Sequence, residues 1–253
     1  MTHGRQRILR AMRILPLSLA VAAALTTPGS AAAEQHPIVE GLNPRVLIKK
    51  SIAYHDPQGR WWTSSNTIAI DQPRPDGSTT RTQFTLHPGY DFDLSGQSDG
   101  QSFAAWLRGD ECRIDKAEGS GRFASMDCTR LKLMRDYYSY LFNAPMNLLD
   151  ESGTIAPVVR EREFLGKTVH SVRIEYGGDS PVWFFFFDPE TFALVGCSFS
   201  KGGLEKDGEY LDYQGEVGGD GILLPKQRIW WTWADHRKLG VDDIAFIRSA
   251  PAE

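Results

Sequence analysis

The stretch that decides the fold is residues 182–195, which read VWFFFFDPETFALV. Two apolar halves flank Asp188-Pro189-Glu190-Thr191, a series typical of a turn between two strands. A strand with one wet face alternates apolar and polar residues, and neither half does so. Both faces of this hairpin must therefore be covered, either by protein or by a bound apolar molecule.

The hairpin has two faces with different side chains. If Pro189 and Glu190 are the central turn residues, Phe187 pairs with Phe192, and Trp183, Phe185 and Phe187 share one face. Two interpretations remain open: both faces are core, or one face lines a lipid-type cavity. The face with the larger residues needs the wider space opposite it. We therefore predict Trp183, Phe185 and Phe187 as ligand-binding residues.

Residues 1–33 are typical of a cleaved signal peptide. The apolar core from Ile14 to Leu25, about a dozen residues, is too short to span a bilayer, and Ala31 to Ala33 provide small residues for signal peptidase. The segment begins with basic residues, namely Arg5, Arg7, Arg10 and Arg13. We expect a soluble periplasmic or secreted protein, residues 34–253, folded as a single domain. The alternative is an uncleaved membrane anchor.

Charge argues against nucleic acid as a partner. Four of the 28 basic residues leave with the signal peptide, so 24 basic residues face 32 acidic ones, a net charge of −8. Such a chain is repelled by nucleic acid and by anionic membrane surfaces. No apolar run in residues 34–253 predicts a transmembrane span.

The remaining pattern predicts an α+β fold. Asn43-Pro44 begins a helix that ends at the turn Asp56 to Gly59, and residues 127–142 form a second helix with an apolar side. About nine strands at hairpin spacing fill the rest, in segments 60–70, 81–86, 90–94, 103–108, 158–176, 182–195, 210–217 and 222–233. Strands and helices do not alternate, so we expect a large curved antiparallel sheet with the N-terminal and middle helices packed on one face.

Two short segments and the hairpin carry a resemblance to a known superfamily. The hairpin Phe187 to Leu194 is similar to a strand–DPxT–strand motif, and Gly221 to Lys226 and Arg135 to Phe142 add to the likeness. The chain resembles the LolA/LolB-like carriers and receptors of outer-membrane lipoproteins, and most closely an uncharacterised exported branch. The resemblance implies a half-open barrel with a hydrophobic cavity. It assigns no acyl-binding residue in this chain.

Cysteines and tryptophans supply further candidates. Cys112 and Cys128 are 16 residues apart, and export makes a disulfide between them possible, while Cys197 is expected as a small buried residue. Adjacent tryptophans on a strand point to opposite faces. We therefore add Trp106 and Trp231 to the predicted ligand-binding residues, with packing in the core or rim as the alternative.

No motif predicts catalysis. The sequence holds neither G-x-S-x-G nor a zinc signature. His55-Asp56, His87 and the pair Asp91 and Asp93 could be read as metal ligands, but a solvated polar strand face is the favoured explanation. We predict no catalytic residue, metal or cofactor. The expected function is binding of a hydrophobic small molecule or acyl chain. An envelope scaffold that meets another envelope protein is the alternative, and a metal-assisted hydrolase ranks last.

Overall fold

The computed structural model describes residues 36–73, 77–98, 101–116, 124–150, 152–200 and 208–251. The expected signal peptide, residues 1–33, lies outside the described residues. Within them, no helix combines the length and apolar character that crossing a bilayer requires.

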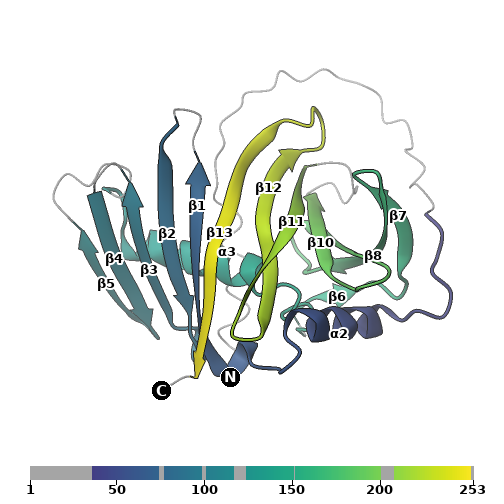
Figure 1. The fold of residues 1–253 in the computed structure, drawn as a ribbon, viewed down its shortest axis with the longest axis horizontal. Coiled ribbons are helices and arrows are strands. Elements are labelled where there is room, and N and C mark those ends of the chain that lie inside the picture. The colour runs from purple at the N-terminus through teal and green to yellow at the C-terminus, as the bar shows by residue number, and fades with distance from the viewer. Residues whose placement is uncertain are drawn as a thin grey trace.

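One antiparallel sheet runs through the described part of the chain (Figure 1). Its order is β5-β4-β3-β2-β1-β13-β12-β11-β10-β9-β8-β6, and β7 also pairs with β8. In Figure 1 the strands fan out at the β5 end and curl round at the β7 end, so the sheet does not close. Its thirteen described strands are β1 (Ser64–Pro73), β2 (Thr79–Leu86), β3 (Phe92–Ser98), β4 (Gln101–Arg108), β5 (Glu111–Lys116), β6 (Thr154–Ile155), β7 (Arg160–Phe164), β8 (Lys167–Glu175), β9 (Val182–Phe187), β10 (Leu194–Ser200), β11 (Glu209–Gly219), β12 (Ile222–Thr232) and β13 (Lys238–Pro251).

Both predicted helices are present. Helix α2 (Pro44–His55) begins at Asn43, whose side chain accepts a hydrogen bond from the Arg45 N–H at 2.9 Å. Helix α3 (Cys128–Phe142) begins at Asp127 in the same way, with a 2.7 Å bond from the Arg130 N–H. Such caps satisfy helix N–H groups that have no partner within the helix. Short 3₁₀ turns, η2 (Trp61–Thr63) and η3 (Pro88–Tyr90), precede β1 and β3.

The main core lies between α3 and the sheet. In Figure 1 α3 crosses behind β2, β1 and β13, while α2 lies below the curled end. Tyr138 of α3 stacks on Phe84 of β2 with ring centroids 4.4 Å apart, and Phe142 meets the same ring edge-on at 4.9 Å. The predicted α+β architecture, with helices packed on one face of a large antiparallel sheet, is confirmed.

Two details of the prediction need correction. Strands β5, β6 and β13 have no counterpart among the predicted segments, although β13 joins β1 to β12 in the middle of the sheet. The two-residue turn at Pro189-Glu190 is also wrong, because Phe187 pairs with Leu194 rather than Phe192. Asp188 explains the longer loop: its carboxylate accepts hydrogen bonds from the N–H groups of Glu190 and Thr191.

The hairpin β9–β10 separates two clusters of buried side chains. Trp183, Phe185 and Phe187 belong to the main core. Phe184 and Phe186 point to the other face and pack in what we call the satellite cluster, whose buried members are Phe164, Val169, Phe184, Phe186 and Tyr210. Protein side chains therefore cover both faces of the hairpin.

A disulfide links the edge of the sheet to α3. Cys112 of β5 is bonded to Cys128, the first residue of α3. Cys197 of β10 is a buried free thiol, and burial raises its pKa to about 12. A thiol that stays protonated at neutral pH is a poor nucleophile, so the residue acts as a packed apolar side chain.

Candidate functional site

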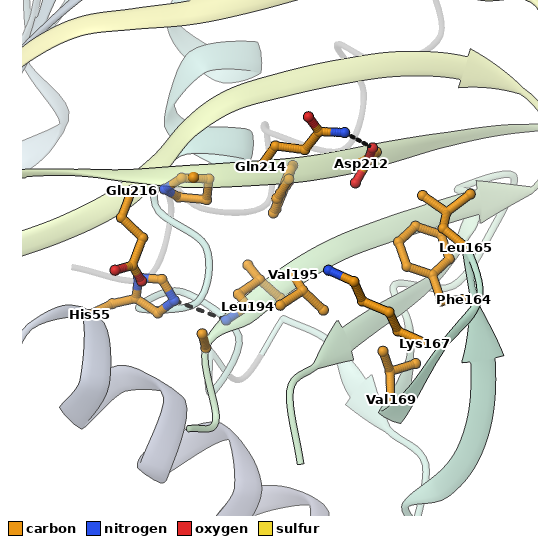
Figure 2. Close-up of a pocket in the computed structure, with 14 residues that line it drawn as sticks. His55, Phe164, Leu165, Lys167, Val169, Leu194, Val195, Asp212, Gln214 and Glu216 are labelled. Carbon is orange, nitrogen blue, oxygen red and sulfur yellow. Dashed lines mark hydrogen bonds between the residues drawn. The ribbon is translucent and has the colours of Figure 1, made fainter. Parts of the chain in front are cut away.

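A pocket of about 550 Å³ lies at the curled end of the sheet, on the satellite side of the hairpin (Figure 2). Its walls come from the β7–β8 hairpin, from β10 and β11, and from the last residue of α2. Ligand pockets typically measure about 300–1,000 Å³, so this one has room for a small molecule or part of a lipid.

The base of the pocket is apolar. Val169 of β8 and Leu194 and Val195 of β10 line it, and Phe164 closes it on the satellite side. Phe164 stacks on Phe186 with ring centroids 4.4 Å apart. It reaches that position over Gly196, where an added Cβ would stand only 2.6 Å from the Phe164 ring.

The opposite wall is polar. Asp212, Gln214 and Glu216 follow one another at alternate positions of β11, so they share a face, although Gly215 adopts a positive φ of 60° between them. The Gln214 amide donates to Asp212 at 2.5 Å. The Tyr54 hydroxyl donates to Glu216, and this bond, together with burial, raises the pKa of Tyr54 to about 12.

His55 forms the end of the pocket beside α2. Its side chain is only 2% exposed. Nε2 accepts a hydrogen bond from the Leu194 N–H at 2.9 Å, and Nδ1 stands 2.8 Å from the Leu223 carbonyl oxygen, which can only accept. The imidazole is therefore neutral, with its proton on Nδ1. Burial lowers the pKa of His55 and favours this form.

Lys167 is the remaining charged side chain of the lining. It follows the tight β7–β8 turn, in which Leu165 and Gly166 both have positive φ. Figure 2 shows its ammonium group directed towards Val195, over the apolar base. Among the residues that the structure describes, it has no hydrogen-bond or ion-pair partner.

The residues predicted to bind ligand lie elsewhere. Trp183, Phe185 and Phe187 come together as predicted on one face, yet each is at most 1% exposed and none lines the pocket. Trp106 is half-buried on β4 beside Arg108, and Trp231 is half-buried on β12, where it stacks on Tyr210 of the satellite cluster. Their role in ligand binding stays a prediction.

No sequence pattern marks Val169, Val195 and Lys167 as residues of a pocket. Asp212 and Gln214 alternate with the larger, buried side chains of Leu211 and Tyr213. This alternation predicts that one face of β11 is exposed to water, and it is the signal from which this wall of the pocket could have been found. Nothing local shows that the β7–β8 hairpin folds over that face.

Of the polar residues considered for metal binding, His87 and Asp93 form a hydrogen-bonded network with Ser65 of β1. His87 Nδ1 stands 2.8 Å from Ser65 Oγ, and its Nε2 stands 2.7 Å from Asp93 Oδ2. Asp93 also pairs with Arg108 at 2.7 Å, whereas Asp91 accepts from the Gly109 N–H. No group of three or more metal-binding side chains gathers within the described ranges.

Solved structures with a similar fold are known. The chain is similar to a LolA superfamily protein from Nitrosomonas europaea, with 10% identity, 84% of this chain and 94% of that chain covered, and a TM-score of 0.49. It is also similar to a DUF1329 family protein from Desulfovibrio piger, with 13% identity, coverages of 81% and 92%, and a TM-score of 0.44.

Family membership comes from the sequence itself. A search among curated proteins finds none that matches. Residues 40–243 match the model of DUF6503, described as a family of unknown function, and the chain belongs to that family.

Proposed function

We propose that this chain is an exported, non-catalytic protein that binds a lipid or acyl chain in the pocket between the β7–β8 hairpin and β11. The observation that supports the proposal is the apolar base formed by Val169, Leu194 and Val195 under about 550 Å³ of space. On the main-core face of the hairpin, Trp183, Phe185 and Phe187 are at most 1% exposed, and none of them lines this pocket.

The energy available to such a ligand is substantial. Each buried CH₂ group contributes about 0.8 kcal/mol, so about eight methylenes on the apolar base contribute roughly 6 kcal/mol. Part of this gain offsets the lost freedom of ligand and side chains. Because 6 kcal/mol alone corresponds to a Kd of about 40 μM, a Kd between about 40 μM and 1 mM is expected for a medium-length chain, which is suitable for reversible carriage.

The test is to fill the pocket. In Val195→Trp a large side chain replaces a half-buried valine of the lining; in the matched control Val46→Trp it replaces an exposed valine of α2. Native mass spectrometry of gently purified protein should show co-purifying lipid in the wild type and the control, and much less in Val195→Trp. The proposal fails if no lipid accompanies the wild type and the neutral apolar dye N-phenyl-1-naphthylamine does not bind.

A second candidate function, hydrolysis at Ser65, is favoured by the hydrogen-bonded series from Ser65 through His87 to Asp93. In serine hydrolases the histidine of such a series takes the serine proton during attack on an acyl carbon. Here Arg108 offsets the charge of Asp93 that would stabilise the protonated imidazole, which favours a structural role. Labelling by a fluorophosphonate that disappears in Ser65→Ala would establish the hydrolase, and absence of labelling would exclude it.

A further inference from the structure

We propose, on the basis of the lipid-binding function, that the ligand is an anionic amphiphile whose carboxylate or phosphate head is bound by Lys167. The pocket combines an apolar base with a small number of polar groups, which is the arrangement that orients a ligand with two chemically different ends. The question is which of those polar groups is free to bind a head group.

The two carboxylates of the lining and His55 already have partners. His55 is neutral and bonded through both ring nitrogens. Asp212 accepts from Gln214, and Glu216 accepts from Tyr54. Lys167 differs from all three, because its ammonium has three donors and no hydrogen-bond or ion-pair partner in the described structure.

A neighbouring carboxylate does not change this conclusion. The Lys167 charge helps to lower the pKa of Asp188, but the main cause is hydrogen bonding from Thr191. The Asp188 side chain accepts from the N–H groups of Glu190 and Thr191 and from the Thr191 hydroxyl, at 2.8 to 3.0 Å. All three bonds are accepted by Oδ1 within the β9–β10 loop, and in the described part of the chain no hydrogen bond or ion pair joins Asp188 to Lys167, so Lys167 remains available.

The position of Lys167 also gives the ligand a direction. Figure 2 shows Lys167 on the hairpin side of the pocket and Glu216 beside His55 at the α2 side. A head group with negative charge is repelled by Glu216 at the α2 side and attracted by Lys167. The head is thus placed at the Lys167 ammonium beside Val195, while the chain extends over Leu194 towards His55.

The experiment compares ligands that share a twelve-carbon chain. Dodecanoate, dodecyl phosphate, dodecanol and dodecyltrimethylammonium are each used to displace N-phenyl-1-naphthylamine from the intact protein. The variants are Lys167→Met and Lys167→Glu, with Lys49→Met, an exposed lysine of α2 outside the pocket, as the matched control.

We expect the two anionic ligands to bind the wild type at least threefold more tightly than dodecanol, as a partly exposed charge-assisted hydrogen bond allows. Lys167→Met should remove this preference, Lys167→Glu should reverse it in favour of the cation, and Lys49→Met should keep it. Equal binding of all four ligands, or tighter binding of the cation by the wild type, overturns the inference and leaves lipid binding intact. Failure of every ligand and of the dye overturns lipid binding itself. A preference between carboxylate and phosphate identifies the source of the head group.

Discussion

His55 makes the stability of the fold depend on pH in a way that one substitution can isolate. The ring joins α2 to two strands, because Nε2 accepts from the Leu194 N–H and Nδ1 donates to the Leu223 carbonyl. A proton added to Nε2 would face the Leu194 N–H, donor against donor. We therefore expect acidification to weaken the junction between α2, β10 and β12, and with it the end wall of the pocket.

The sign and size of this pH dependence follow from the difference in proton binding by His55 between the folded and unfolded chains. Burial lowers the pKa of His55 in the folded state below its ordinary value of about 6.5. As the pH falls below about 6.5, the unfolded chain takes up this proton first, so the free energy of unfolding falls. The contribution is fully present above pH 6.5 and is lost as the pH falls through the folded-state pKa, at a slope approaching about 1.4 kcal/mol per pH unit.

The assay is guanidinium unfolding followed by tryptophan fluorescence between pH 5 and 8, for the wild type and His55→Gln. Asp242 is buried and has a raised pKa, so it titrates with the opposite sign; the difference between the two proteins removes this shared contribution. His170→Gln serves as a comparison: burial lowers the pKa of His170 too, but this residue of β8 is less deeply buried, so its removal should flatten the pH slope less. An equal pH slope in wild type and His55→Gln would refute the reasoning.

Three further predictions concern the hairpin and its surroundings. Gly196→Ala should lower the free energy of unfolding by about 1–3 kcal/mol in chemical denaturation, because the new Cβ meets the Phe164 ring at 2.6 Å; an unchanged midpoint would contradict the packing. The double variant Cys112→Ser with Cys128→Ser should lose about 2–4 kcal/mol by the same method, since the bond closes a loop with a sequence separation of 16, and full stability without it would contradict this account. Asp188→Ala should lose about 1–2 kcal/mol in thermal unfolding as the loop loses its acceptor, whereas an unaltered melting temperature would show that the loop holds its shape without it.

Local signals predict part of the fold well. The capping residues Asn43 and Asp127 mark the starts of both helices, and the unbroken apolar run of β9 indicates a strand buried on both faces. The local apolar pattern does not predict strand β13, because Asp242 and Asp243 interrupt it. The structure accommodates Asp242 in a buried site, where Gln72 donates at 2.7 Å and Trp230 at 3.2 Å. Those donors lie 170 and 12 residues away, so no short window of sequence predicts the strand.

The pocket is beyond local prediction for a related reason. The strands that form its apolar base and its polar wall follow one another in the chain, but the space between the base and the wall exists only because the sheet curls. Phe164 packs over Gly196, which brings the β7–β8 hairpin and Lys167 across from β11. Gly196 and Phe164 are 32 positions apart, so no local pattern in the sequence predicts that the ring packs where the glycine has no side chain. Curvature of a sheet is decided by such distant pairs, whereas the faces of each strand are decided locally.

The two faces of the hairpin differ in what a ligand must displace. On the Trp183 side, Trp183 lies against Tyr140 of α3 at 4.8 Å and stacks on Phe185 at 5.9 Å. A chain entering there has to move at least two large side chains from buried positions, each stabilised by about 1.5–3 kcal/mol, which offsets most of the roughly 6 kcal/mol gained from about eight methylenes. On the satellite side the space beside Val195 is already open, and no core residue has to move. The same apolar run therefore provides packing on one face, while on the other it borders the pocket in which we propose that a lipid binds with the least rearrangement.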